Sequence, residues 1–507
     1  MASHYRLYDG MGEVIPFNAR YSYPTQANRA WKSLIKIPAK NGTSFKSNQN
    51  PTIRIELPAQ AYLNTSSSFL SFDAEFNVAP TSLGCHFQNN CQSWIKRARW
   101  VYGSLVGEDI RDYNVIVRNL TEGTGTNNTG ISDQTTLTEG VGGIRTVPLL
   151  DGTTAMVNVR AYEIQQANQV TPQDTLPVYT GLVDQPRRYQ VQLALGLFQQ
   201  NKLLPLKWMA SQLAIELEMA DFDECCCHGG PATGTDFYTI SNVMYLADLV
   251  EFDGTYDAAF LEGLRNGGVP IKFASWDTFQ VTPAPSDKQT IMIPERNRSI
   301  KAAFCVQLPP RRPSSDKYTD ADGDAYLPWD SHAFLESSNG MDYTSGQSYG
   351  WLQNYQWRVG GKYYPSQAVQ CGDTARTNGG VEAYNEYAKA LNIVGDYRLS
   401  TAVNTTRWIK ARGSGNAMST CVDWWGNEGP KAKRPISSTG PSCFVISADF
   451  ETTAGEEVSG LNGEEQNDIA LMIQYSGPQN PLCSYDVFVY YDALLILRDN
   501  NLVELIK

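Results

Sequence analysis

The sequence predicts an all-β fold made of two copies of one β domain, and three observations carry this prediction. Aromatic residues reach 11%, and 41 Gly and 26 Pro are scattered along the 507 residues. Strands favour aromatic and β-branched residues, whereas turns favour Gly and Pro. Apolar residues also recur at every second position in several segments, and a segment of the first half recurs in the second.

Five segments alternate apolar and polar residues with the period of a half-buried strand. In the first of them, Ile53, Ile55 and Leu57 alternate with Arg54 and Glu56. This period turns one side of each strand toward a core and the other toward solvent. The remaining segments span residues 70–78, 191–197, 213–219 and 469–475.

Helical spacing of apolar residues is confined to three short segments. The pair Gly267 and Gly268 ends the second, because glycine favours the backbone conformation found after helix C-termini. The predicted helices span residues 108–120, 257–264 and 381–394, with apolar faces of Ile110, Tyr113 and Val117 in the first and of Tyr384, Tyr387, Ala388 and Leu391 in the third.

An internal repeat indicates duplication. Residues 243–253 align without gaps on residues 489–499, with five of eleven positions identical, at an offset of 246 residues that nearly halves the chain. Two β domains that superpose strand for strand explain this match. The predicted organisation is an extended N-terminal arm over residues 1–45, a first domain over 46–253, a linker helix over 254–267 and a second domain with long loop insertions over 268–507.

Long polar stretches interrupt the strands. Connections of this length are uncommon inside compact domains and usually lie on the surface, where they carry function. The predicted surface loops span residues 119–150, 309–350, 371–380 and 395–440.

Six stretches, taken in order, resemble one known family. They are residues 53–64 (IRIELPAQAYLN), 69–76, 107–114 (GEDIRDYN), 203–208 (LLPLKW), 357–365 (WRVGGKYYP) and 485–497. In order and spacing they are similar to the double jelly-roll major capsid proteins of eukaryotic DNA viruses, with the polinton-like and virophage branch nearest. The resemblance implies two side-by-side, eight-stranded antiparallel jelly rolls with few short helices and long surface loops. It further implies homotrimers that form pseudo-hexagonal capsomers of an icosahedral shell, with neighbouring capsomers, penton proteins and minor capsid or cement proteins as partners.

The net charge of −12 and the pI near 5.0 argue against direct nucleic-acid binding, because neutralising phosphates requires an excess of Lys and Arg. Residues 1–16 are polar and lack the apolar segment of a signal peptide, and no stretch approaches the ~18 apolar residues of a membrane span. We expect a virion protein that is made in the host cytoplasm and not secreted, with its ten Cys largely as free thiols.

Two motifs resemble catalytic or calcium sites but lack required parts. Ser348 lies in a G-x-S-x-G motif with His332 nearby, yet a polar loop precedes it where a nucleophile elbow needs a strand. Asp320, Asp322 and Asp324 do not make a complete EF-hand loop, since the Gly and Glu of that loop are missing. The first is interpreted as a structural loop and the second as a solvated acidic turn, with a loosely bound cation as the alternative.

The run from Cys225 to His228 could suggest zinc. Structural zinc sites need four ligands, usually as two spaced pairs, and the spacing of Cys85, His86 and Cys91 does not supply the second pair. A Cys-rich turn is favoured, and a cluster formed in space stays open.

Two short basic runs, 96–99 and 431–434, are interpreted as surface charge. The first lies between Trp94 and Trp100 and is expected in a strand whose Lys and Arg face solvent or a neighbouring subunit. The second is expected in a solvated loop, with a nuclear-import signal as the alternative.

Three function classes remain after these motifs. A capsid structural protein explains the duplication, the acidic charge and the long loops, and it has no catalytic, cofactor-binding or metal residues. A jelly-roll carbohydrate-binding, lectin-like protein is the alternative, because jelly rolls also serve lectins. A hydrolase would need a paired-carboxylate or triad site, for which the sequence offers no candidate. Assembly into trimers and shells separates the first class from the second.

Overall fold

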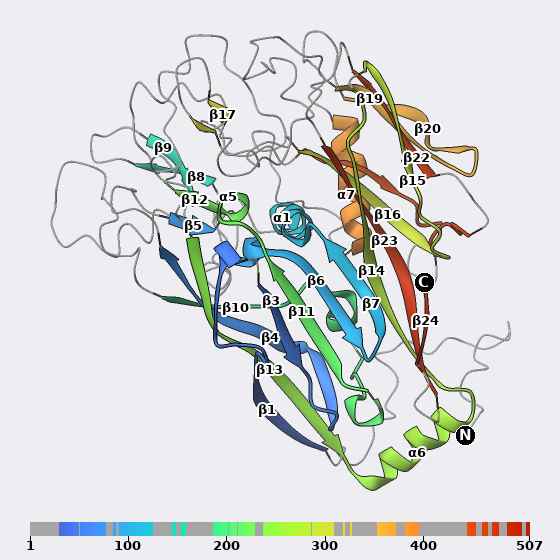
Figure 1. Cartoon of the computed structure of the whole chain (residues 1–507). Coiled ribbons are helices and arrows are strands. Elements are labelled where there is room, and N and C mark those ends of the chain that lie inside the picture. Colours follow the sequence, from blue (N-terminus) through green and yellow to red (C-terminus); the bar gives the residue numbers. More distant parts are fainter. Residues whose placement is uncertain are drawn as a thin grey trace, which may run out of the picture.

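The computed structural model describes residues 30–49, 51–77, 85–87, 91–124, 144–148, 154–158, 186–200, 202–209, 211–228, 237–284, 286–308, 318–319, 325–326, 352–371, 381–394, 444–452, 459–464, 469–475, 484–498 and 503–507. Two β-sandwiches lie side by side, one coloured blue to green and the other yellow-green to red (Figure 1). Within these ranges, no helix is both long enough and apolar enough to cross a membrane.

The first sandwich pairs a five-stranded with a four-stranded antiparallel sheet. The larger sheet has the order β1-β13-β4-β10 with β2 beside β13, and the smaller has the order β3-β11-β6-β7. Their bounds are β1 Ala30–Pro38, β2 Ser44–Lys46, β3 Thr52–Glu56, β4 Tyr62–Asn77, β6 Ile95–Tyr102, β7 Leu105–Arg111, β10 Arg187–Val191, β11 Leu213–Met219 and β13 Phe237–Phe252.

The second sandwich repeats this arrangement. Its larger sheet has the order β14-β23-β16-β21 with β24 beside β23, and its smaller sheet has the order β15-β22-β19-β20. Their bounds are β14 Val269–Val281, β15 Lys288–Ile293, β16 Ile300–Leu308, β19 Leu352–Val359, β20 Lys362–Gln370, β21 Ile446–Asp449, β22 Ile469–Tyr475, β23 Ser484–Leu497 and β24 Val503–Ile506. Three two-stranded ribbons complete the strands: β5 Cys85–Phe87 with β12 Cys226–His228, β8 Ile144–Pro148 with β9 Thr154–Asn158, and β17 Tyr318–Thr319 with β18 Ala325–Tyr326.

The two sandwiches have the same strand order. Leaving aside β2 and β24, the larger sheet of each contains the first, eighth, third and sixth of its eight main strands, and the smaller contains the second, seventh, fourth and fifth. This order defines a jelly roll in both halves. The predicted all-β fold with two jelly rolls is confirmed.

The core follows the predicted alternation. On β3, Ile53 and Ile55 are fully buried, whereas Arg54 and Glu56 are only partly covered. The fourth strands, β6 and β19, place Trp100 and Trp357 in the two sandwich interiors, and both side chains are fully buried. Large aromatic side chains therefore fill equivalent positions of the two cores.

Part of the predicted N-terminal arm belongs to the first sandwich. Ala30–Pro38 form β1, which pairs along its whole length with β13, and Ser44–Lys46 form β2. The sequence of β1 alternates only weakly, with an exposed Leu34 and partly buried Ile35 and Ile37. The reason is that β1 is an edge strand and buries few of its residues. The described part of the first sandwich thus begins at residue 30 instead of 46.

The helices agree with the sequence at two of three places. The helices are α1 Tyr113–Thr124, α4 Gly196–Gln199, α5 Phe222–Cys225, α6 Gly254–Arg265 and α7 Val381–Val394, with 3-10 turns η2 Ser47–Gln49, η3 Cys91–Trp94 and η4 Leu206–Trp208. α6 and α7 lie where predicted. The prediction of a helix from residue 108 was wrong, because β7 continues to Arg111 and the chain turns at Asp112, whose φ is +51°.

The segment 191–197 also differs from its prediction as a strand. β10 ends at Val191, and α4 begins at Gly196. Leu193, Leu195 and Leu197 are buried as expected, although they lie outside the sheet. Burial in this segment does not alternate, because Ala194, Gly196 and Phe198 are buried as well.

The duplication extends to a buried aspartate on the eighth strand of each sandwich, which pairs with a lysine and accepts a hydrogen bond from a serine. Asp248 on β13 pairs with Lys32 at 2.8 Å and accepts a hydrogen bond from Ser67. Asp492 on β23 pairs with Lys272 at 3.4 Å and accepts a hydrogen bond from Ser299 at 2.7 Å.

Register fixes which residues of the two clusters correspond. Leu34 lies opposite Asp248, and Ala274 lies opposite Asp492. In each sandwich the paired Lys precedes that residue by two positions. Asp248 therefore corresponds in the structure to Asp492, whereas the sequence alignment pairs Asp248 with the residue two positions after Asp492. A shift of two residues along a strand keeps every side chain on the same face of the sheet.

Replacing Asp492 by Ala should lower the free energy of unfolding by about 3 kcal/mol, because it leaves the partly buried amines of Lys272 and Lys301 without their shared carboxylate. Glu464→Ala is the control, since the Arg298–Glu464 pair is exposed on both sides and should contribute less than about 0.5 kcal/mol. Urea denaturation measures both. Equal effects of the two substitutions would contradict the structural role of the cluster.

Candidate functional site

Several sequence motifs lie outside the described residues. They are Ser348 with His332, the acidic run 320–324 and the basic run 431–434, so their interpretations stay predictions. The acidic run connects β17 to β18 in the chain.

The Cys- and His-containing segments of the first sandwich are neighbours in space. β12 pairs with β5, so that Cys85 lies opposite His228 and His86 lies opposite Cys227. Spacing along the chain could not show this pairing. Among the side chains that the structure describes, no group of three or more His, Cys, Asp or Glu could hold a metal ion. Four described thiols carry no disulfide: Cys91, Cys225, Cys305 and Cys371.

The basic run 96–99 lies on β6, as predicted for a strand. Arg97 pairs with Asp109 at 2.5 Å, and Arg99 pairs with Glu216 at 2.5 Å. These acids lie on the neighbouring strands β7 and β11. The two arginines therefore stabilise the outer face of their own sheet through cross-strand ion pairs.

The main structural site is the junction between the sandwiches. β7, an edge strand of the first sandwich, runs beside β14, an edge strand of the second (Figure 1). The backbone N–H of Arg111 donates to the Thr278 hydroxyl at 3.2 Å, and the rings of Trp100 and Phe273 lie 6.1 Å apart. The junction therefore combines a polar contact at the end of β7 with aromatic packing.

A buried carboxyl group lies at this junction. Glu108 on β7 is 1% exposed, and its carboxylate accepts hydrogen bonds from the Gly196 N–H at 3.0 Å and from the Trp100 indole at 3.2 Å. Burial raises the pKa of Glu108 to about 7, although these donors and the Ser275 hydroxyl favour the charged form. Sequence reasoning missed this residue because it assigned Glu108 to a helix, whereas the two-residue spacing to Ile110 marks both as inward-facing on a strand.

The close approach of α4 to β14 requires glycine. A Cβ on Gly196 would lie 1.5 Å from the carbonyl oxygen of Ala274. Gly196 thus donates to Glu108 on one side and touches the second sandwich on the other. No sequence signal distinguished this glycine from those in turns.

The junction continues through helices α1 and α7. Each of them follows the fifth strand of its own sandwich, and the two helices contact one another. The Tyr387 hydroxyl on α7 donates to the Asn119 carbonyl on α1 at 3.1 Å. α7 also covers the second sandwich, where Tyr387 meets Phe304 edge to face.

The linker helix α6 is docked on the first sandwich. The Tyr62 hydroxyl donates to Asp257 at 3.0 Å and accepts from the Trp208 indole at 2.8 Å, and Lys207 pairs with Asp257. The rings of Trp208 and Phe260 stack at 5.9 Å. The connection between the sandwiches is therefore a packed element and not a free tether.

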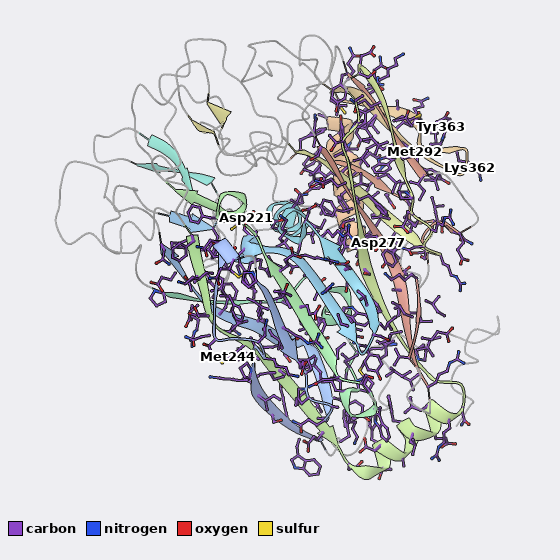
Figure 2. The ribbon with its side chains drawn as sticks, in the orientation of Figure 1. Asp221, Met244, Asp277, Met292, Lys362 and Tyr363 are labelled. Atoms are coloured by element: carbon purple, nitrogen blue, oxygen red, sulfur yellow. The ribbon has the colours of Figure 1, made fainter. Side chains whose placement is uncertain are left out.

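Two edge strands, β1 and β20, expose apolar side chains. β1 exposes Trp31 to 65% and Leu34 to 62%, and β20 exposes Tyr363 to 47%. Figure 2 shows Lys362 and Tyr363 on the outer side of the second sandwich.

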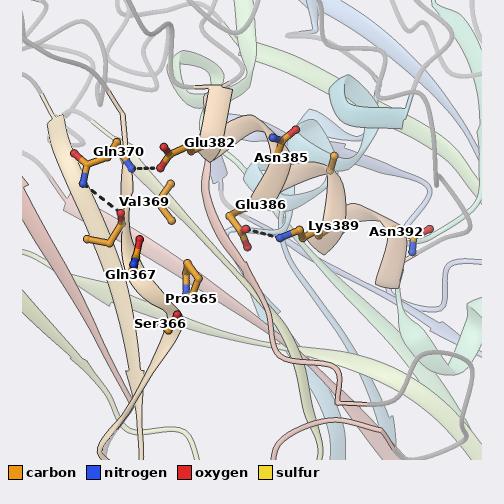
Figure 3. A pocket seen from close by; sticks show the side chains of 12 residues that line it. Pro365, Ser366, Gln367, Val369, Gln370, Glu382, Asn385, Glu386, Lys389 and Asn392 are labelled. Atoms are coloured by element: carbon orange, nitrogen blue, oxygen red, sulfur yellow. Dashed lines mark hydrogen bonds and ion pairs between the residues drawn. The ribbon is translucent and has the colours of Figure 1, made fainter.

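A groove of about 790 Å³ lies between β20 and α7 (Figure 3). On its walls, Glu382 accepts a hydrogen bond from the Gln370 N–H at 2.8 Å, and Glu386 pairs with Lys389 at 2.6 Å. The groove carries two carboxylates and one amine from α7, and residues of the edge strand β20 form its other wall.

Strand order and junction together define a double jelly-roll protein. No protein-family model matches the chain, and no curated protein matches its sequence. Its fold is similar to VP54 of PBCV-1, fitted into a reconstruction of the virophage Sputnik, with a TM-score of 0.50, 10% identity, and coverage of 96% of this chain and 98% of that chain.

Two further structures are similar. A chain in the cryo-EM structure of the Sputnik virophage has a TM-score of 0.50 and 10% identity, with 97% of this chain and 91% of that chain covered. The mavirus major capsid protein has a TM-score of 0.48 and 10% identity, with 98% and 95% covered. In the two structures with a TM-score of 0.50, the shared fold extends over nearly the whole of each chain.

Replacing Glu108 by Gln should remove one component of the pH dependence of stability. Because the folded pKa, about 7, exceeds the ordinary 4.5, the folded state holds a proton that the unfolded state loses. The contribution of Glu108 is thus fully present below pH 4.5 and is lost as pH rises to about 7, by up to ~1.4 kcal/mol per pH unit. Unfolding of both proteins across this range measures it; parallel stability curves would contradict the assignment.

Replacing Gly196 by Ala should destabilise the junction by about 3 kcal/mol, because the new methyl group collides with backbone that cannot rotate away. Gly254→Ala is the matched control, since its Cβ meets no atom within 4 Å and alanine favours the helix. Thermal unfolding of both variants tests the difference. A Gly196→Ala protein as stable as the control would show that α4 does not depend on this contact.

Proposed function

We propose that this chain is a major capsid protein, a structural subunit that trimerises into pseudo-hexagonal capsomers of an icosahedral DNA-virus shell. One observation carries the proposal: two jelly rolls of identical strand order are fixed side by side in one chain. The similarity to VP54 of PBCV-1 and to a chain of the Sputnik virophage, over nearly their full lengths, supports it. Two equivalent lobes per chain give six lobes per trimer, which tile a nearly hexagonal lattice.

The remaining parts of the proposal follow from this role. The protein acts as a building block without catalysis or cofactor, and its partners are other copies of itself, penton proteins and minor capsid or cement proteins. It resides in the virion, after synthesis in the host cytoplasm. The charge of −12 supports a shell protein without direct genome contacts. The proposed division is an arm before residue 30, a first sandwich to residue 253, a linker helix over 254–267 and a second sandwich thereafter.

Light scattering on the 56.2 kDa chain should give three times the chain mass at micromolar concentration. Closed cyclic symmetry is usual for soluble homo-oligomers, and permanent interfaces bury more than ~2,000 Å². Negative-stain images should show trimers or shells. A stable monomer that binds glycans on an array and forms no shells in any buffer would favour the lectin-like alternative.

Deleting residues 1–29 should leave both sandwiches folded and weaken capsomer or shell assembly. The segment lies before β1, and Tyr5, Tyr8, Tyr21 and Tyr23 suit it to anchor on neighbouring subunits. A deletion of residues 1–40 is the comparison, because it also removes β1 and should lower the unfolding temperature. Unchanged assembly after the shorter deletion would exclude the arm from the interface.

A further inference from the structure

The linker helix α6 ends in an Asn-Gly pair. Asn266 is the C-cap of α6, and its backbone N–H donates to the Glu262 carbonyl at 3.0 Å. Gly267 and Gly268 follow before β14 begins at Val269. The helix and the residues after it connect the two sandwiches at the lower end of the molecule in Figure 1. A covalent change at Asn266 therefore falls within the connection between the sandwiches.

An Asn side chain that precedes Gly can react with its own backbone. The backbone nitrogen of the Gly attacks the side-chain carbonyl carbon Cγ of the Asn, and a C–N bond forms. The bond from Cγ to the amide nitrogen breaks, and ammonia leaves with the proton of the attacking N–H. Water then opens the resulting succinimide ring at either carbonyl and leaves aspartate or isoaspartate. Asn is a thermolabile residue, and a following Gly has no Cβ to hinder the attack.

The sequence contains five Asn-Gly pairs, and three of them lie in the described part of the chain. These three begin at Asn41, Asn266 and Asn462. Because the local sequence makes all three candidates, only the structure distinguishes them. The difference lies in whether the Asn amide and the following backbone nitrogen are free to approach each other.

The amide of Asn41 is bound to β3 through both of its polar atoms. Its Nδ2 donates to the Thr52 carbonyl at 2.5 Å, and its Oδ1 accepts from the Arg54 N–H at 3.0 Å. Cyclisation would break both hydrogen bonds, because Cγ must turn from β3 toward the nitrogen of Gly42. Asn41 is therefore protected by its side-chain contacts.

At Asn462 the attacking nitrogen is already engaged. The Gly463 N–H donates to the Asn297 carbonyl at 2.8 Å, and Gly463 is buried. The Oδ1 of Asn462 also accepts a hydrogen bond from the Glu464 N–H at 3.0 Å. Asn462 is therefore protected by the backbone around it.

Asn266 lacks both kinds of protection. Asn266 and Gly267 are exposed, and neither the Asn266 amide nor the Gly267 N–H is hydrogen-bonded to another described residue. A Cβ at Gly267 would meet no atom within 4 Å, and the φ of Gly267 is +127°, a conformation that favours glycine. Rotation about ψ of Asn266, which is 25°, brings the two groups together. The described hydrogen bond that resists this rotation is a long one, from the Gly268 N–H to the Gly263 carbonyl at 3.3 Å.

We infer that Asn266 is a site of spontaneous deamidation, at which water converts the C-cap of α6 into aspartate and isoaspartate while Asn41 and Asn462 persist. The reactants are the Asn266 amide, the Gly267 nitrogen and water, and the by-product is ammonia. The inference goes beyond the proposed capsid function and does not depend on it.

The product stabilises α6 less than Asn266 does. The C-terminus of a helix carries a partial negative charge, so a carboxylate at this position is repelled. Glu262 lies one turn earlier and is exposed, and like charges at this spacing are also destabilising. Isoaspartate further adds a methylene carbon to the main chain between α6 and β14. The last turn of α6 should therefore open more readily in aged protein, while Asp257 and Phe260 keep the earlier turns docked.

Peptide mapping by mass spectrometry, after incubation of the full-length protein at mildly alkaline pH, tests the site. Fragmentation that separates isoaspartate from aspartate should show deamidation at Asn266 about tenfold or more faster than at Asn41 and Asn462, because each protected site must first break two hydrogen bonds.

The same incubation of protein unfolded in guanidinium chloride is the control for local sequence. There the three rates should converge, since the hydrogen bonds that protect Asn41 and Asn462 are lost. Equal rates at the three sites of the folded protein would overturn the inference. So would an Asn266 that stays intact in the folded protein while the unfolded chain reacts.

Hydrogen exchange measures the effect on α6. Asn266→Gln keeps an uncharged amide but blocks the reaction, because the longer side chain cyclises far more slowly. After equal incubation, the last turn of α6 should exchange about threefold faster in the unsubstituted protein than in Asn266→Gln. Asn462→Gln is the matched control and should leave this difference unchanged. Identical exchange in aged unsubstituted protein and aged Asn266→Gln would contradict the weakening of α6.

Discussion

The double jelly roll depends on how one carboxyl group holds α4 against the second sandwich. Glu108 receives the N–H of Gly196, and Gly196 in turn lies against the backbone of Ala274. A larger residue at Gly196 or an unpaired charge at Glu108 would separate β7 from β14. Together with the packing of Trp100 on Phe273 and the contact of α1 with α7, this contact fixes the relative placement of the two sandwiches.

The alternation of apolar and polar residues along the strands made most of the fold predictable from the sequence. The segment containing Ile53 alternates cleanly because one side of β3 meets a core, and the segments containing Leu213 and Ile469 keep large apolar residues at every second position. The alternating pattern wrongly predicted a strand where the chain stays buried after leaving a sheet, as at Leu193. It gave no clear signal where an edge strand buries little, as at Leu34. Burial and strand pairing are different properties, and the apolar leucines of segment 191–197 indicated burial without strand pairing.

The site was less predictable than the fold. Gly196 and Glu108 matter only because β14, far away in the chain, lies beside them, and no local pattern encodes a distant neighbour. The same holds for Cys85 and His228, which strand pairing brings opposite each other. The repeat was visible in the sequence, yet its register was fixed only by the ion pairs that the buried Asp248 and Asp492 form with lysines of the neighbouring strands.

Because helix α6 is docked on the first sandwich, folding and association of the protein depend differently on its concentration. Because Asp257 and Phe260 fasten the linker to the first sandwich, the second sandwich is held at a high effective concentration beside its internal partner edge. That junction forms as a first-order event at any dilution. Contacts between chains are second-order, so their formation depends on the concentration of the protein, whereas the internal junction does not.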